Sequence, residues 1–252
     1  MKHIPPSHIL YHSRLQCDGA KRDLNALKRR ISNYKISPLR MTPQKNKGKV
    51  THTWPPPIPD IWGQIAFNIA NSLRASINYI TWQLAIKHLA GTRTPSDNTQ
   101  FPICDCPGNT RGGFQYQISK QLADVFPPAI ADIEYFQPYN RTNRPETHLL
   151  SVLREISNKT KHRFIIPTQG IIMPIIKGPA QMHISFHNGH PCIRTTRINE
   201  SGITEEFNPP ITFEIGIEIP TLTPSYYDIT VLNSIYDLIR NNILPRFMGY
   251  FE

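Results

Sequence analysis

The segment from Asp60 to Lys87 constrains the fold most, because Arg74 is the sole charged residue between these two positions. Apolar side chains recur through it at helical spacing: Ile65, Ile69, Leu73, Ile77, Ile80 and Leu84. A helix with so few charges has little surface to offer to water. The sequence therefore predicts one long, central and nearly buried helix from about Ile61 to Ala90, with Asp60 as its N-cap.

The pattern changes along the chain. Helical periodicity continues to about residue 163, whereas residues 164–252 carry short β-branched runs broken by Pro and Gly. Asn188-Gly189 is a strong signal for a two-residue hairpin turn, and a last helical pattern ends at Pro245. We expect an α+β fold, in which an N-terminal helical layer with one long central helix precedes an antiparallel β-sheet closed by a C-terminal helix.

Three parts are expected. Residues 1–50 form a basic N-terminal helical arm, residues 51–163 a helical part, and residues 164–252 an antiparallel β part with its closing helix. We expect residues 51–252 to form one domain.

The positive charge is concentrated in the arm. Residues 1–50 hold 12 of the 28 Lys and Arg residues and two of the 18 Asp and Glu residues, so the net charge of +10 belongs to the arm and the rest is neutral. The expected basic helix face consists of Lys21, Arg22, Lys28, Arg29 and Arg30. Such a face favours nucleic acid or an acidic protein as partner. The alternative is a solvated face that maintains solubility.

Several classes are disfavoured by what the sequence lacks. Its four cysteines are too few for a disulfide scaffold, and its N-terminus has no continuous apolar core of a signal peptide. It has no run of 18 apolar residues, and no Gly-rich phosphate loop, HExxH, GxSxG or EF-hand pattern. We expect a cytoplasmic protein with no cofactor and no membrane contact.

Arg74 is the first candidate site residue. Asn71 and Asn78 lie three residues before it and four after it, so all three share one stripe of the helix. A charge taken out of water needs a partner or a ligand, because its desolvation costs several kcal/mol. The functional interpretation is an anion or phosphate contact in a cleft between helices. The alternative is an ion pair with a carboxylate such as Glu155 on a neighbouring helix.

The second candidate is the end of the helix before residue 164. Glu155, Asn158 and His162 fall on one face, and a helix C-terminus favours the charged form of His162. His162 is a candidate general acid or base, with Lys161 and Arg163 binding an anion. The alternative is that three cations cap the last turn.

The third candidate is the hairpin. If Asn188-Gly189 is its two-residue loop, His187 pairs with His190 and Cys192 lies on the same face. His187, His190 and Cys192 are side chains of the kind that bind zinc, but their spacing matches no specific zinc pattern. A solvated face is the favoured interpretation, so no metal is expected.

Four segments together resemble those of a family of bacterial proteins with no established activity. Residues 71–84 (NSLRASINYITWQL) are similar to the family's NLRSALDHLAWQL, residues 99–103 (TQFPI) to its T-x-FPI, residues 137–139 to its QPY, and residues 156–163 (ISNKTKHR) to its LSNIDKHR. The likeness covers about residues 54–166 and implies the helical architecture and the two helical sites, not a function.

The family's long helix carries an Arg, four further residues and a His, which is also the loose Arg-x4–6-His pattern of the HEPN ribonucleases, enzymes that cleave RNA without metal. In this chain Tyr79 stands at the His position, and Asn78 replaces the family's Asp. This distant similarity implies a catalytic set of Arg74, Asn78, Tyr79 and His162.

Two functional hypotheses follow. The leading one is a non-enzymatic binding module that contacts nucleic acid or an acidic partner through its basic arm. The alternative is a metal-independent ribonuclease-like or phosphate-handling enzyme that uses Arg74 and His162.

Overall fold

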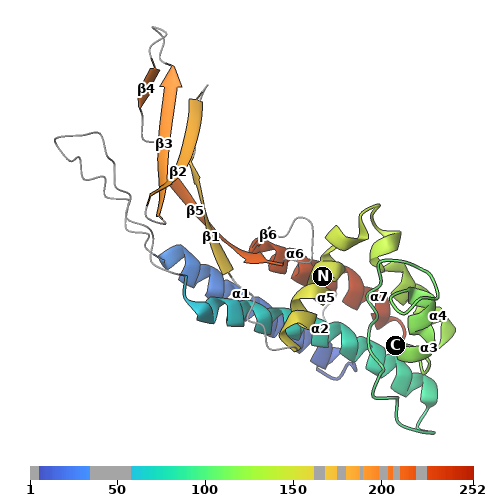
Figure 1. The fold of residues 1–252 in the computed structure, drawn as a ribbon. Coiled ribbons are helices and arrows are strands. Elements are labelled where there is room, and N and C mark those ends of the chain that lie inside the picture. Colours follow the sequence, from blue (N-terminus) through green and yellow to red (C-terminus); the bar gives the residue numbers. More distant parts are fainter. Residues whose placement is uncertain are drawn as a thin grey trace.

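The computed structural model describes residues 6–34, 58–161, 168–174, 180–187, 190–198, 204–206, 211–219 and 226–252. Side chains are described for residues 6–34, 58–158, 216–217, 219 and 227–252. Most of the described residues are helical, and the strands project from one end of the helices (Figure 1).

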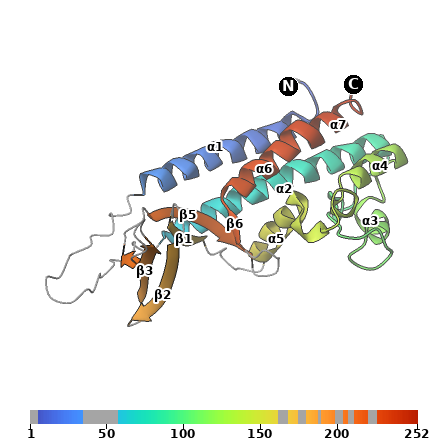
Figure 2. The same cartoon turned by 90° about the horizontal axis from the view of Figure 1, so that it is seen from above.

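Two long helices form the centre of the molecule. Helix α1 (Tyr11–Asn33) runs antiparallel to α2 (Asp60–Leu89), and the two lie side by side (Figure 2). Buried side chains repeat every three or four residues along both helices, namely Cys17, Ala20, Leu24 and Leu27 on α1 and Ile69, Leu73, Ile77, Ile80 and Leu84 on α2. Burying each large apolar side chain stabilises the fold by about 1.5–3 kcal/mol, so α1 is part of the main hydrophobic core.

The prediction of a long central helix is confirmed, but two details of it are wrong. Pro59 is the N-cap and Asp60 is the first helical residue, so Asp60 makes no side-chain cap. The helix is also less buried than expected, because Ile61 and Ile86 near its two ends are 49% and 39% exposed. Ala90 ends the helix in the left-handed region, at a φ of 47°.

A buried polar cluster fixes the register of α1 on α2. The hydroxyl of Ser13 donates to the Ser76 carbonyl oxygen at 2.7 Å, and the Ser76 hydroxyl donates to the Ser13 carbonyl oxygen at 2.9 Å. The Cys17 sulfur lies 3.1 Å from the same Ser76 hydroxyl. Because buried polar groups are costly without partners, a shift of either helix would be penalised.

Shorter helices cover the other side of α2. In chain order they are α3 (Phe114–Gln121), α4 (Pro127–Tyr135), the 3₁₀ turns η1 (Pro138–Asn140) and η2 (Pro145–Thr147), and α5 (Leu149–Lys161). Helix α5 packs against α2, and residues 101–104 of the loop between α2 and α3 are buried.

The C-terminal segment is a continuous helical run with a distortion. Helix α6 (Thr230–Leu238) leads into a π turn, η3 (Ile239–Ile243), and then α7 (Leu244–Met248). The prediction that Pro245 ends the helix is wrong. A proline cannot donate the usual backbone bond, and the wider π turn just before it accommodates that loss.

The described strands form two separate antiparallel sheets. One has the order β1 (Thr168–Pro174), β5 (Ile211–Glu218), β6 (Tyr226–Asp228), and the other β2 (Ala180–His187), β3 (His190–Ile198), β4 (Thr204–Glu206). An α+β mixture is thus present, but it is mostly helical. The expectation of one sheet closed by the C-terminal helix is wrong, because the described strands form two sheets and α6 packs on α1, α2 and α5.

Candidate functional site

The segment after α2 threads between helices without forming a strand. Phe101 is fully buried there, and its backbone is held by two α2 side chains. Nη2 of Arg74 donates to the Phe101 carbonyl oxygen at 2.7 Å, and Oδ1 of Asn78 accepts from the Phe101 N–H at 3.1 Å. Two candidate catalytic residues, one helical turn apart, therefore anchor a loop.

A buried glutamine holds the next residues of the loop. Oε1 of Gln137 accepts from the Cys104 N–H at 2.9 Å, and its Nε2 donates to the carbonyl oxygens of Pro102 and Ile133, both at 3.0 Å. A fixed loop needs every buried backbone group paired, and Gln137 pairs two of them.

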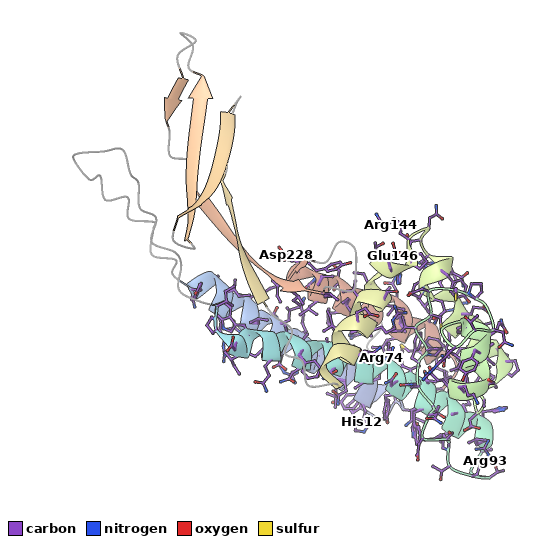
Figure 3. The ribbon with its side chains drawn as sticks, in the orientation of Figure 1. His12, Arg74, Arg93, Arg144, Glu146 and Asp228 are labelled. Carbon is purple, nitrogen blue, oxygen red and sulfur yellow. The ribbon has the colours of Figure 1, made fainter. Side chains whose placement is uncertain are left out.

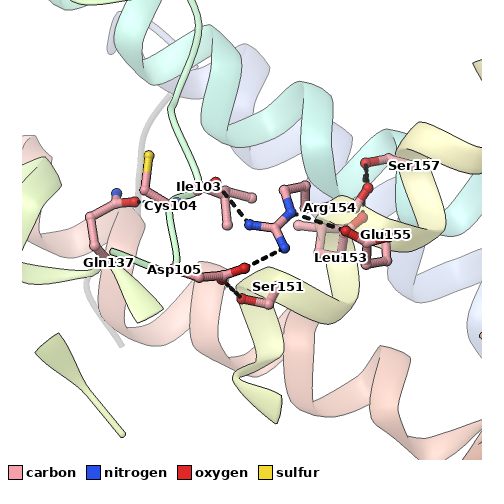
Figure 4. Close-up of polar contacts among 9 residues, drawn as sticks. All are labelled: Ile103, Cys104, Asp105, Gln137, Ser151, Leu153, Arg154, Glu155 and Ser157. Atoms are coloured by element: carbon pink, nitrogen blue, oxygen red, sulfur yellow. Dashed lines mark hydrogen bonds and ion pairs between the residues drawn. The ribbon is translucent and has the colours of Figure 1, made fainter. Parts of the chain in front are cut away.

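Arg154 on α5 completes the set of anchors (Figure 4). Its Nη1 donates to the Ile103 carbonyl oxygen at 3.1 Å, its Nη2 lies 2.7 Å from Oδ2 of Asp105, and its Nε lies 3.2 Å from Oε1 of Glu155. The Ser151 hydroxyl donates to the other Asp105 oxygen at 2.7 Å. Burial opposes the charge of Arg154, but Asp105 and Glu155 outweigh it, so the pKa of Arg154 is raised.

The anchored loop forms one wall of a pocket of about 540 Å³. Other walls come from α2, α3 and α5. The lining residues are Arg74, Gln100, Ile103, Asp105, Cys106, Gly112, Gln117, Gln121, Arg154 and Asn158. The volume lies in the range of small-molecule sites, and most of the lining side chains are polar.

Arg74 is the unusual member of this pocket. It lies midway along α2, next to α5 (Figure 3). Its pKa is lowered to about 10, first by burial and then by the nearby cation of Arg154, and the carboxylate considered as its partner, Glu155, is bonded by Arg154. At neutral pH Arg74 stays protonated. Its Nη1 is buried without a hydrogen-bond partner among the described residues.

Among the described residues, the two arginines of the pocket are paired differently. Arg154 forms ion pairs with Asp105 and Glu155, whereas Arg74 donates one hydrogen bond to a neutral carbonyl oxygen. A desolvated cation with a free donor is stabilised by an anion that accepts from it.

The other candidate catalytic residues are placed differently. The Tyr79 ring packs edge-on against His12 of α1, with ring centroids 5.8 Å apart, so Tyr79 is turned toward α1 and is not among the pocket residues. His162 and Arg163 lie outside the described residues, as does the side chain of Lys161. From this second candidate segment, Asn158 reaches the pocket and thereby comes close to Arg74.

The basic residues of α1 are divided between two environments. Lys21 donates to Oδ1 of Asn233 and lies over the Tyr236 ring, 4.8 Å from its centroid, so it is bound to α6. Lys28 is half-buried. Arg22, Arg29 and Arg30 are exposed, and Arg29 donates to the Asn25 carbonyl oxygen at 3.4 Å.

The hairpin has the predicted register. His187 lies opposite His190 and Ser185 opposite Cys192, but the side chains of His187, His190 and Cys192 are outside the described ones. Within the described side chains, no three His, Cys, Asp or Glu residues are grouped closely enough to hold a metal ion.

Sequence reasoning missed most of the pocket. Gln117, Gln121 and Arg154 carried no recognised pattern, although Arg154 and Asn158 are four residues apart and so share one face of α5. The four-residue spacing between Arg154 and the candidate site residue Asn158 could have indicated that Arg154 belongs to the same site.

Among the described residues, none of the helices combines the length and apolar character needed to cross a bilayer. No protein-family model, curated protein or solved structure matches the chain.

Proposed function

We propose that the chain binds a small anionic ligand, carrying a phosphate or carboxylate group, in the pocket that Arg74 and Arg154 line. The observation that carries this proposal is the buried Nη1 of Arg74, which has no partner in the described part of the chain. A charged hydrogen bond from this nitrogen would offset part of the cost of desolvating the guanidinium.

Binding is favoured over catalysis because the carboxylate that lines the pocket is already hydrogen-bonded. The one carboxylate of the pocket, Asp105, accepts from Ser151 and Arg154, which leaves it poorly placed to take a proton. Ribonuclease-like chemistry with Arg74 and His162 stays a separate hypothesis. It requires a base from residues beyond those described.

Isothermal titration calorimetry tests this proposal: inorganic phosphate is titrated into the wild-type chain and into two variants. Arg74→Gln removes the cation, and Asn78→Ala is the matched control, because it removes the other side-chain bond to Phe101 without changing the charge. We expect Arg74→Gln to weaken binding by about 10-fold to 100-fold, the equivalent of roughly 1.5–3 kcal/mol for a charged hydrogen bond. Equal losses in both variants would show that the loop, and not the cation, matters.

A second proposal concerns the basic face of α1. We propose that it contacts nucleic acid, since Arg22, Arg29 and Arg30 are exposed and therefore free to meet phosphates. Arg22 and Arg29 are seven residues apart, so they lie on one stripe of the helix.

Charge reversal tests this second proposal without disturbing the core. The variant Arg22→Glu/Arg29→Glu is compared with Arg111→Glu/Lys120→Glu, which reverses two exposed charges elsewhere. Fluorescence anisotropy with a single-stranded RNA should show weaker binding and a smaller salt dependence for the α1 variant, by roughly 0.7 in log–log slope per lost phosphate contact. Equal effects of the two variants would indicate a response to net charge alone.

A further inference from the structure

A second residue of the pocket lining also has a buried polar atom without a partner. Oε1 of Gln121, the last residue of α3, is buried and unpaired among the described residues, like Nη1 of Arg74. The two atoms are complementary in kind, since the guanidinium nitrogen is a charged donor and the amide oxygen an acceptor. A ligand that satisfies both carries an acceptor together with an O–H or N–H donor, and an anionic acceptor makes the stronger bond to the guanidinium.

The rest of the lining selects among such ligands. No aromatic ring is among the described residues that line the pocket, so it offers no stacking surface for a nucleobase. Ile103 is the one aliphatic side chain in the lining, which leaves little surface for an acyl chain. The polar side chains of Gln100, Gln117 and Asn158 supply further hydrogen-bonding groups.

We infer that the ligand is a small hydroxylated anion, of the sugar-phosphate or sugar-acid class, whose anionic group binds Arg74 while a hydroxyl donates to Gln121. This inference rests on the proposed anion binding at Arg74 and adds the recognition of the uncharged part of the ligand. Each hydroxyl that pairs with a buried amide removes the penalty of leaving that amide unsatisfied.

Matched pairs of small molecules test the inference on the full-length chain. Glucose 6-phosphate is compared with phenyl phosphate, and gluconate with benzoate, so that each pair shares an anionic group and differs in its hydroxyls. We expect the hydroxylated member of one pair to bind at least about tenfold more tightly than its aromatic counterpart. The pair that shows this difference identifies phosphate or carboxylate as the anionic group.

Variants at Gln121 connect the preference to the pocket. Gln121→Leu and Gln121→Met remove the amide while keeping a side chain of similar size. In both variants we expect the affinity ratio of the hydroxylated ligand to its aromatic counterpart to fall below about threefold. Arg74→Gln should weaken both members of each pair.

The outcomes separate the two claims. Equal affinity of the wild-type chain for the members of both pairs overturns this inference and leaves anion binding at Arg74 in place. A preference that persists in the Gln121 variants also overturns it. If none of the four anions and no inorganic phosphate binds, the proposed function fails as well.

Discussion

Arg74 and Asn78 bind the two backbone polar groups of one residue, Phe101, from positions one turn apart on α2. Phe101 is not in a β-strand, so these side chains supply the hydrogen bonds that a neighbouring strand would otherwise make to its N–H and carbonyl groups. The sole charge between Asp60 and Lys87 is thus partly a loop anchor through Nη2 of Arg74, while its Nη1 has no hydrogen-bond partner among the described residues.

We expect Asn78→Ala to lower the free energy of unfolding by about 1–3 kcal/mol, because it leaves the buried Phe101 N–H without an acceptor. Urea denaturation followed by circular dichroism measures the change. Asn78→Asp is the control, since it retains an acceptor oxygen at the same length. A loss below about 0.5 kcal/mol, the range of ordinary surface substitutions, would contradict the role of this anchor.

Gly113 permits the close turn of the pocket loop. A Cβ placed there would lie 1.9 Å from the carbonyl oxygen of Gly108, a backbone atom, whereas one on neighbouring Gly112 would meet nothing within 4 Å. We expect Gly113→Ala to destabilise the chain by about 1–3 kcal/mol, as overpacking does, and Gly112→Ala to change stability by less than about 0.5 kcal/mol. Thermal unfolding of the two variants compares them, and similar melting temperatures would refute the close approach.

His148 makes the stability depend on pH. Its Nδ1 accepts from the Leu150 N–H at 3.2 Å, which requires that nitrogen to be unprotonated. Its pKa lies below the ordinary value of 6.5, first because of burial and then because of Arg141, while Asp105 opposes the shift. As the pH falls below about 6.5, the unfolded chain takes up a proton that the folded chain resists, so the free energy of unfolding decreases.

His148→Asn isolates this contribution, because Asn keeps a cap acceptor but does not titrate. Urea titrations between about pH 7.5 and 5.5 should show a smaller loss of stability in the variant than in the wild-type chain. Parallel pH profiles would mean that other histidines account for the dependence.

Local patterns were enough to predict several elements. The uncharged run after Asp60 predicted α2 almost to its ends, and Asn188-Gly189 predicted the register of β2 on β3. Both features depend on near neighbours in the chain, namely helical periodicity and turn geometry.

Features that depend on distant partners were not predictable. Arg154 meets Asp105 across 49 positions, and Gln137, which belongs to the QPY segment of the sequence, bonds Cys104 across 33. Alternation identifies strands but does not assign their partners, so the division into two sheets was missed. The pocket is made of such long-range contacts. Of its lining, Arg74 and Asn158 were candidate site residues, and Gln100 and Ile103 lay in a segment of the family resemblance.

Residues 51–252 should not fold as an independent unit. Removing residues 1–50 would delete α1, take its buried Cys17, Leu24 and Leu27 out of the core, and leave Ser76 without Ser13 and Cys17. Burial of each apolar side chain contributes about 1.5–3 kcal/mol. The sum over several of them exceeds half of a typical free energy of unfolding of about 5–15 kcal/mol. We expect the truncated chain to lack a cooperative thermal transition. Native-like melting would show that α1 is a separate arm.

Cysteine reactivity should report the environment of the pocket loop. Cys106 is exposed, whereas Cys17 and Cys104 are buried, and burial raises the pKa of their thiols to about 11 and about 12. Because the thiolate is the nucleophile, we expect iodoacetamide at about pH 8 to alkylate Cys106 at least about a hundredfold faster. Mass spectrometry of tryptic peptides follows each site, with fragmentation separating Cys104 from Cys106. Urea should abolish the difference, and rapid alkylation of Cys104 in the folded chain would place the loop outside the core.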